Sequence, residues 1–253
     1  MPGVIAPDAQ VEFVIFIRGH GYLRIHGVEN RMRRQPAAFA YTQIHGCLEI
    51  ATSGSASFIA FRTNMAVAQA LLGYPPSEQI DTCVDLTEDW RSQISTLLAR
   101  LRSSGRDRHG SILENFIAQL LHGVDDEFIG MAGLYDWMLA NRAPMRWSEV
   151  GSMLGYTCRT LERRFQGAGG ISPRSIAGVG RFLGCCRALR SSPHTDISEI
   201  AHELGFYDHA HFSNQFKRYA LVTPTQFQNI PHADMVDPSA VVARSECRNI
   251  TSV

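Results

Sequence analysis

Two segments in the last third of the chain carry polar side chains at helical spacing, of types that bind nucleic acid. In the first, Arg159, Glu162, Arg163 and Gln166 lie at positions i, i+3, i+4 and i+7. Arginine donates to guanine O6 and N7, and glutamate accepts from cytosine N4. The second segment presents a similar set, namely His209, His211, Asn214, Lys217 and Arg218. An ordinary solvated helix more commonly carries paired Glu and Lys, so both sets favour DNA binding.

The opposite face of each segment is apolar. Leu161 and Phe165 lie four residues apart in the first, and Phe212 and Phe216 do so in the second. This spacing is typical of amphipathic helices that bury one face against a neighbour. The helices are predicted near residues 157–167 and 208–219. Their expected N-caps are Thr157 and Asp208.

A duplicated segment precedes each of these helices. Residues 148–155 match residues 198–205 at an offset of about 50. Each copy has a serine expected to cap a short helix, two apolar residues four apart, and a glycine where the helix ends. A small residue, Gly151 or Ala201, is expected to let another helix cross closely. A short helix, a tight glycine turn and a second helix form a helix-turn-helix, here present twice. The alternative is an ordinary helical hairpin repeat.

Residues 145–230 resemble the DNA-binding domain of the AraC/XylS family of bacterial transcription regulators. The resemblance covers about a third of the chain and is closest in the second half. The matching segments are residues 159–165, 170–173, 196–201, 204–208, 212–218 and 223–224. Arg181 also falls where the family places an arginine in its connecting helix. The resemblance implies two recognition helices in successive major grooves, joined by a helix from about Pro173 to Arg190, with half-sites about 10 base pairs apart.

We assign the polar side chains to two roles on this basis. The candidates for base edges are Arg159, Glu162, Arg163, Gln166, His209, His211 and Asn214. The candidates for phosphates are Arg164, Ser213, Lys217 and Arg218. Three roles stay open: Glu162 could instead pair with a neighbouring arginine, Gln166 could bind a base or a phosphate, and a neutral histidine can donate or accept whereas a protonated one only donates. The expected partner is double-stranded DNA, and no catalytic residue, metal or cofactor is expected.

The segment departs from the family pattern at several positions. Leu221 replaces a glycine, so the preceding helix is expected to end differently. Gln228 replaces an arginine, and Gly151 replaces an alanine. The connecting helix carries three glycines, Gly178, Gly180 and Gly184, each of which costs up to about 1 kcal/mol in a helix interior. We therefore expect that helix to be less rigid than usual.

The elements before this module are of two kinds. Residues 1–64 predict a β-rich region, a small barrel or sandwich of cupin-like form, because Val11, Phe13, Ile15 and Ile17 alternate with other side chains. A turn is expected at residues 19–21, followed by short strands at residues 22–25, 38–41, 47–50 and 58–61. Residues 65–122 predict helices: one begun at Met65 and broken by Pro75–Pro76, one capped by Thr87, and one over residues 112–121. The predicted fold class is therefore α+β, with an all-α domain of two helix-turn-helix motifs after the β-rich part.

The domain boundaries follow from these patterns. We predict a sensor or dimerisation domain at residues 1–122, a linker near residues 123–126, the DNA-binding domain at residues 127–230, and a disordered tail at residues 231–253. Residues 1–122 weakly resemble an N-terminal domain of unknown function that is found fused to this module, through residues 71–79. No residue identifies an effector, and the β-rich interior could hold a small molecule or be a packed core. Homodimer formation and contact with RNA polymerase are further expectations.

The other residues that could do chemistry carry only structural expectations. His20, His26 and His45 lack the H-x-H or H-x-E clustering of a metal cupin and are expected at the surface. Arg31, Arg33 and Arg34 are expected in a solvated loop. The expected core or domain-contact residues are Trp90, Trp137, Trp147, Cys47 and Cys83. No G-x-S-x-G, Walker or Rossmann pattern occurs, so enzyme chemistry is not expected.

Composition sets the outer limits. The chain has 253 residues, 45% hydrophobic and 19% charged, so it can bury a core, and its formal net charge is zero. Residues 127–230 hold 11 basic and 8 acidic residues, a surplus that suits a nucleic-acid partner. No apolar run is long enough to span a membrane and residues 1–13 resemble no secretory signal, so we expect a cytoplasmic protein with reduced cysteines. The alternative function is a cupin-like small-molecule-binding or enzymatic protein whose degenerate helix-turn-helix binds a partner.

Overall fold

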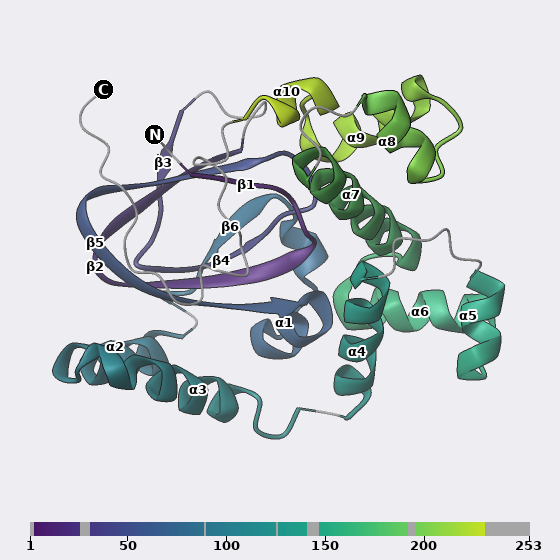
Figure 1. Cartoon of the computed structure of the whole chain (residues 1–253). Coiled ribbons are helices and arrows are strands. Elements are labelled where there is room, and N and C mark those ends of the chain that lie inside the picture. Colours follow the sequence, from purple (N-terminus) through teal and green to yellow (C-terminus); the bar gives the residue numbers. More distant parts are fainter. Residues whose placement is uncertain are drawn as a thin grey trace.

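The computed structural model describes residues 3–25, 31–88, 90–124, 126–140, 147–191 and 196–230. The predicted tail at residues 231–253 and His26 lie outside these ranges, as does the side chain of Trp147. The N-terminal half contains an antiparallel sheet with helices against it, and the C-terminal half is helical (Figure 1). The predicted α+β class is therefore confirmed.

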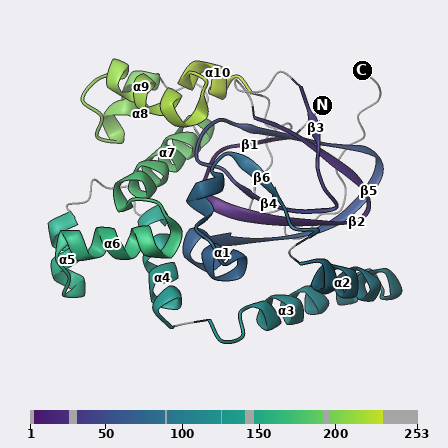
Figure 2. The same cartoon turned by 180° about the vertical axis from the view of Figure 1, so that it is seen from behind.

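The sheet has six strands in the order β1-β5-β2-β4-β6, with β3 also paired to β2. The strands are β1 Gly3–Ile5, β2 Gln10–Ile25, β3 Arg33–Arg34, β4 Ala38–Thr42, β5 Leu48–Asn64 and β6 Thr82–Asp85. The two long strands, β2 and β5, pair over most of their length and curl the sheet back on itself (Figures 1 and 2). This curl gives the sheet an inner face and an outer face.

Two sequence predictions about the strands are wrong. The expected turn at residues 19–21 is a bulge inside β2, so the expected strand at residues 22–25 is the end of β2. The expected short strands at residues 47–50 and 58–61 belong to the single strand β5. Gly19 takes a left-handed conformation, with φ of 76°, at the bulge. A Cβ on Gly19 would lie 2.9 Å from the backbone of Ala56, so glycine here allows close strand contact while the strand bends.

The alternating residues of β2 fill two separate apolar clusters. Val11, Phe13 and Ile15 are fully buried on the outer face, as the alternation predicted. There the Phe13 ring stacks on Phe61 at 4.6 Å and on Trp90 at 5.5 Å between ring centroids. The inner face carries its own buried cluster, which consists of Ile5, Phe16, Leu23, Ile25, Phe39, Tyr41 and Leu48.

Three helices accompany the sheet: α1 Met65–Leu72 precedes β6, and α2 Arg91–Ser103 and α3 His109–Leu120 follow it. Helix α1 ends before Pro75, as predicted. The predicted cap of α2 is wrong, because α2 begins after Trp90 without a side-chain cap. Thr87 instead lies in the preceding turn, where its backbone N–H donates to Asp85 at 2.8 Å. The Thr87 hydroxyl also donates to the Asp85 carboxylate, at 2.5 Å. Thr87 is therefore part of this turn and does not cap α2.

The C-terminal half contains the predicted pairs of helices. Its elements are α4 Asp126–Ala140, α5 Trp147–Leu154, α6 Cys158–Gly169, α7 Pro173–Ser191, α8 Ile197–Glu203, α9 His209–Ala220 and α10 Pro224–Gln228. The pair α5–α6 and the pair α8–α9 lie at opposite ends of α7 (Figure 1). Helix α7 is the predicted connecting helix, and it matches the expected range within one residue.

The glycines of α7 lie where other elements approach closely. A Cβ on Gly178 would lie 2.0 Å from the Tyr219 hydroxyl of α9, and a Cβ on Gly180 would lie 2.9 Å from the carbonyl of Met138 in α4. These glycines therefore allow close packing, which accounts for them better than a need for a flexible helix.

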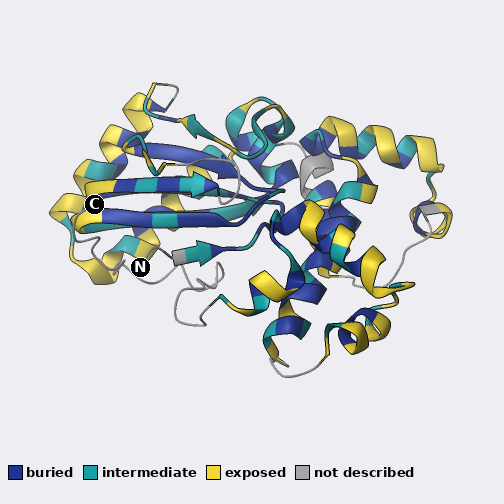
Figure 3. Cartoon of the chain, turned by 90° about the horizontal axis from the view of Figure 1, so that it is seen from above, coloured by how far each residue is buried: buried dark blue, intermediate teal, exposed yellow. Residues whose placement is uncertain are grey.

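One apolar cluster runs from the outer face of the sheet into the helices of the C-terminal half. Buried residues are concentrated where the sheet meets these helices (Figure 3). Tyr135 of α4 is fully buried, and its ring lies 4.7 Å from that of Phe165 in α6. Trp90 is buried as expected, but Trp137 is 43% exposed, so the core expectation for Trp137 is wrong. Within the described ranges, no helix is long and apolar enough to cross a membrane.

Candidate nucleic-acid interface

The first helix pair, α5 and α6, positions the first polar set. The Thr157 side chain caps α6 by accepting from the Thr160 N–H at 3.1 Å, as predicted. Leu161 and Phe165 are buried and bind α6 to the body of the protein. Ser148 lies inside α5, which begins at Trp147, so Ser148 is not the cap that the sequence predicted.

A tight turn joins α5 to α6. Gly155 has φ of 71°, and the Tyr156 N–H donates to the Gly151 carbonyl at 2.8 Å. A Cβ on Gly151 would lie 2.5 Å from the Tyr156 carbonyl. The small residue thus makes room for the turn itself, whereas the sequence predicted a crossing helix. Ala201 holds the matching position in the second copy, where the Phe206 N–H donates to its carbonyl at 2.9 Å, so a small residue serves the same turn in both copies.

The second pair, α8 and α9, repeats the arrangement. The Asp208 carboxylate caps α9 by accepting from the His211 N–H at 2.6 Å, and Phe212 and Phe216 are buried. The cap of α8 differs from the prediction, because Asp196 accepts from the Ser198 N–H at 2.9 Å. The carboxylate precedes the helix and points at its first free N–H groups, which leaves Ser198 inside the helix.

The predicted base-contacting residues of α6 lie on one exposed face. Arg159, Glu162, Arg163 and Gln166 are all exposed. Among the described residues, Glu162 forms no ion pair with either arginine, so its carboxylate is open to other partners. The Gln166 side chain donates to the Gly170 carbonyl at 2.9 Å and closes the end of its own helix.

The predicted phosphate-contacting residue of α6 is oriented by an aromatic ring. The Arg164 guanidinium carbon lies 4.5 Å from the centroid of the Tyr156 ring, in the turn before α6. This cation–π contact holds the arginine at the edge of the exposed face. The sequence pattern did not identify Tyr156, because its role depends on the turn that brings it beside Arg164.

The exposed face of α9 carries the second set. His209, His211, Asn214, Lys217 and Arg218 are exposed, and Ser213 is partly buried. The His211 ring packs edge-on against Phe206, with 5.5 Å between ring centroids. The structure therefore places each polar set on one side of its helix, at the two ends of α7.

The sequence pattern did not predict several apolar side chains that are exposed near these helices. Tyr207, in the turn before α9, is 93% exposed, and Met153 and Leu154 are exposed on α5. The apolar periodicity of the helices gave no signal for them, because exposure of a turn residue depends on how the two helices meet. A tyrosine held out of the core beside a capped helix is a candidate to contact DNA.

The end of α9 contradicts one expectation. Leu221 keeps the left-handed conformation, with φ of 58°, and its N–H donates to the Lys217 carbonyl at 3.0 Å. Its side chain packs against the inner cluster of the sheet. This apolar contact offsets the strain of a left-handed leucine, which costs roughly 1–2 kcal/mol, so the helix ends as it would with glycine.

The loop between β4 and β5 also holds this end of α9. The Gly46 N–H donates to the Tyr219 carbonyl at 2.5 Å, and the His45 ring stacks on the Tyr219 ring with 6.0 Å between centroids. The Asp81 carboxylate fixes the loop, because it accepts from the His45 N–H at 2.9 Å and lies 2.9 Å from His45 Nδ1. His45 is therefore part of a contact between the two halves, not the isolated surface residue that was expected.

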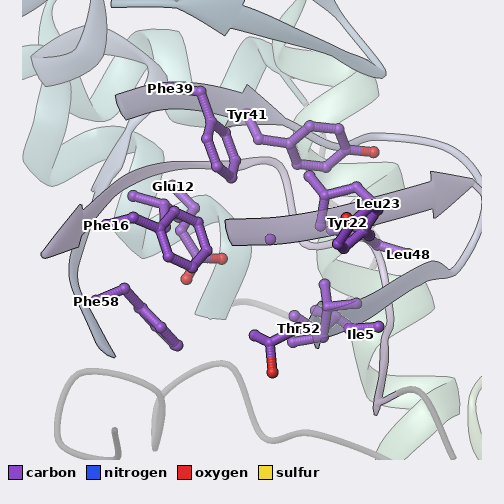
Figure 4. A pocket seen from close by; sticks show the side chains of 14 residues that line it. Ile5, Glu12, Phe16, Tyr22, Leu23, Phe39, Tyr41, Leu48, Thr52 and Phe58 are labelled. Atoms are coloured by element: carbon purple, nitrogen blue, oxygen red, sulfur yellow. The ribbon is translucent and has the colours of Figure 1, made fainter. Parts of the chain in front are cut away.

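A small apolar pocket lies on the inner face of the sheet. Figure 4 shows Glu12, Phe16, Phe39, Tyr41 and Phe58 around it, and the cavity has a volume of about 50 Å³. Glu12 is the one acidic residue among the described residues that line it. Burial raises the pKa of the Glu12 carboxyl to about 7. The sequence left open whether this interior is a pocket or a packed core, and the structure contains a pocket.

Metal binding has no support in the described ranges. They contain no group of three or more His, Cys, Asp or Glu residues that could hold a metal ion. His20 instead lies beside Arg34, whose guanidinium is 3.1 Å from its Nε2. Arg31, Arg33 and Arg34 are in or near the short strand β3, and Cys47 is buried as expected.

The fold and the two exposed polar faces together define a protein with a double helix-turn-helix module. A family model described as "Helix-turn-helix domain" matches residues 150–230. The transcriptional activator RhaS of Salmonella arizonae is 29% identical over 102 residues, which are 40% of this chain and 36% of RhaS. RhaS of Pectobacterium atrosepticum is 31% identical over 97 residues, 38% of this chain and 34% of that protein. Residues 150–230 are thus an AraC-type helix-turn-helix domain, the DNA-binding domain of a family of transcription regulators.

The matched part is limited in length. The chain spans about a third of the length of these two curated relatives. Among solved structures, ToxT from Vibrio cholerae O395 is similar over 89% of this chain and 95% of ToxT, with 12% identity and a TM-score of 0.42. The C-terminal domain of AraT from Geobacillus stearothermophilus is similar over 41% of this chain and 84% of its own length, with 21% identity and a TM-score of 0.34. Likeness at this level carries no functional argument.

Proposed function

We propose that this protein is a sequence-specific transcription regulator that binds two successive major grooves of DNA. The observation that carries the proposal is the pair of capped helices α6 and α9, here called the reading helices. Each buries its apolar face and exposes a set of hydrogen-bonding side chains, and both are attached to one connecting helix. A helix held in this way can enter a major groove with its polar face toward the bases.

The side chains divide between bases and phosphates as their chemistry directs. Arg159 and Arg163 donate to guanine, and Asn214 pairs with adenine through two hydrogen bonds. Glu162, Gln166, His209 and His211 are the other base contacts in the proposal. The phosphate contacts are Arg164, Ser213, Lys217 and Arg218, which would position the protein without selecting a sequence.

The proposal also assigns the pocket on the inner face of the sheet to a small-molecule effector. Its support is an apolar cavity that contains one carboxyl group, since ligand sites combine apolar walls with a few polar groups. The Leu221 side chain, which follows a reading helix, packs against the same cluster of residues. An occupied pocket could thereby alter the end of α9. RNA polymerase and a second copy of the chain stay predicted partners.

The test is DNA binding by the purified protein as salt rises from 50 to 300 mM. The DNA is the stretch upstream of its own gene, with random DNA as the comparison. Arg163→Ala and Asn214→Ala should each weaken specific binding by roughly 5- to 150-fold, which corresponds to about 1–3 kcal/mol per bidentate base contact. Arg106→Ala is the matched control, because Arg106 is an exposed arginine on the short helical turn Arg106–Arg108, away from both reading helices.

The outcomes separate the regulator from the alternative function. Specific binding that falls steeply with salt, and that both variants weaken, supports the proposal. A protein whose helix-turn-helix binds another protein would show no preference for the upstream DNA at any salt, with or without metabolites added. Loss in only one variant would restrict base reading to one of the two helices.

A further inference from the structure

The inner pocket is apolar apart from one group. Val14, Phe39 and Leu48 are among the residues that form its walls, from β2, β4 and β5. Glu12 lies on the same face of β2 as Phe16, and both side chains project into the pocket (Figure 4). A Cβ on Gly21 would lie 2.5 Å from the Phe16 ring, so glycine at this position leaves the ring its place in the pocket wall.

The Glu12 carboxyl has no partner within the described part of the chain. No hydrogen bond or ion pair involves it, although Arg62 lies directly opposite on β5 and Tyr41 lies opposite on β4. Arg62 instead forms an ion pair with Asp8. Glu12 is half-buried, and withdrawing a carboxylate from water without a partner is costly, so a strand position of this kind would normally favour an apolar residue.

The side chains that line the pocket favour a positively charged ligand over a negatively charged one. The described lining residues include no Arg, Lys or His, so an anionic ligand would find no countercharge there. A cation would find the Glu12 carboxylate and the faces of several aromatic rings, which attract cations. The aromatic residues of the lining are Phe16, Tyr22, Phe39, Tyr41 and Phe58.

We propose that the pocket binds a small apolar molecule that carries one protonated amine, with the ammonium group paired to the Glu12 carboxylate. The inference rests on the proposed function, in which this pocket is the effector site, and it names the effector's chemical class. The cavity of about 50 Å³ suits a short alkyl chain. An ammonium group supplies both the missing countercharge and the missing hydrogen-bond donors.

The pairing predicts how binding changes with pH. Burial gives the Glu12 carboxyl a pKa of about 7 in the empty pocket, and an ammonium ligand binds its ionised form. Binding should therefore strengthen about tenfold between pH 6 and pH 8 as the ionised fraction rises. The charged or titratable groups that face Glu12 are Tyr22, Tyr41 and the ion pair of Arg62 with Asp8.

The experiment is calorimetric titration of the full chain with n-alkylamines from propylamine to hexylamine, against the matching n-alkanols. The amines should bind the wild type at least tenfold more tightly than the alkanols at pH 8. Glu12→Gln should remove that preference. Glu88→Gln is the matched control, because Glu88 is exposed and outside the pocket. Glu12→Asp keeps the charge and should keep the preference, so the series remains decisive even if Glu12→Gln fails to fold.

Two results would overturn the inference. If amines and alkanols bind equally and without pH dependence, the pocket is an apolar site in which Glu12 has no role. If no probe of the series binds the folded wild type, the pocket takes no ligand of this class. DNA titration of the same samples without any ligand tests the proposed function separately, because wild type and Glu12→Gln should both retain specific DNA binding if only the ligand inference is wrong.

Discussion

At the scale of single residues, Glu12 should make the stability of the protein depend on pH. Its pKa is raised to about 7 from an ordinary value of 4.5. Below pH 4.5 the carboxyl is protonated in both states and costs nothing. Between about pH 4.5 and 7 the unfolded chain releases this proton and the folded chain retains it, so the free energy of unfolding falls as pH rises.

Glu12→Gln should therefore stabilise the protein at pH 8 and have little effect at pH 4.5. The expected gain at pH 8 is on the order of 1–3 kcal/mol, from the size of the pKa shift. Urea unfolding of both proteins at the two pH values measures it. Parallel pH profiles for the wild type and the variant would mean that a partner neutralises Glu12 in solution.

Leu221 offers a second test, because it combines backbone strain with a useful side-chain contact. Leu221→Ala removes the contact with the inner cluster but keeps a left-handed residue with a Cβ. Leu221→Gly removes the same contact and relieves the strain. We expect the glycine variant to be more stable than the alanine variant by about 1 kcal/mol in urea unfolding. Equal stabilities would show that the left-handed conformation is not strained at this helix end.

At the scale of elements, much of the candidate site follows from sequence pattern. The periodicity of Leu161, Phe165, Phe212 and Phe216 determines which face of each reading helix is buried, and so which side chains remain exposed. Local capping chemistry also placed Thr157 and Asp208 correctly. These features are predictable because each depends on neighbours within one turn of helix.

The sheet was harder to predict, because strand length depends on partners distant in the chain. The glycines near residue 20 and residue 54 are typical of turns, but β2 and β5 pair through both regions and become one bent ribbon. The pocket and the contact of His45 with Tyr219 could not be predicted for the same reason. Both arise from the curl of the sheet, which brings the β4–β5 loop to the end of α9.

The N-cap of α8 can be tested, because the repeat in the sequence suggested Ser198 and the structure has Asp196. Asp196→Ala should lower the free energy of unfolding by about 0.5–2 kcal/mol, because its carboxylate accepts from the Ser198 N–H. Ser198→Ala is the matched variant and should change stability by less than about 0.5 kcal/mol. Thermal unfolding of the two variants measures the difference. The reverse order would restore Ser198 as the cap that its place in the repeat suggested.

At the scale of the whole molecule, the N-terminal half holds both helix-turn-helix units. The Gln69 side chain of α1 donates to the Gly167 carbonyl of α6 at 2.6 Å, and Ser77 packs against Gly170 just after α6. At the other unit, the Gly46 N–H donates to the Tyr219 carbonyl of α9. The separation of the two reading helices is therefore set by these contacts as well as by α7.

This arrangement predicts strict spacing between the two DNA half-sites. The wild type should bind operators of native spacing well and should lose most of its affinity when one or two base pairs are inserted, since each pair rotates one half-site relative to the other. His45→Ala combined with Gln69→Ala removes contacts at both units without altering either reading helix. The double variant should tolerate the insertions better, at some loss of affinity for the native spacing. Gel-shift titrations over the operator series measure both effects, with Arg106→Ala as the control.

An unchanged spacing profile in the double variant would mean that α7 alone fixes the separation of the reading helices. The N-terminal half would then have to act on DNA binding by another route.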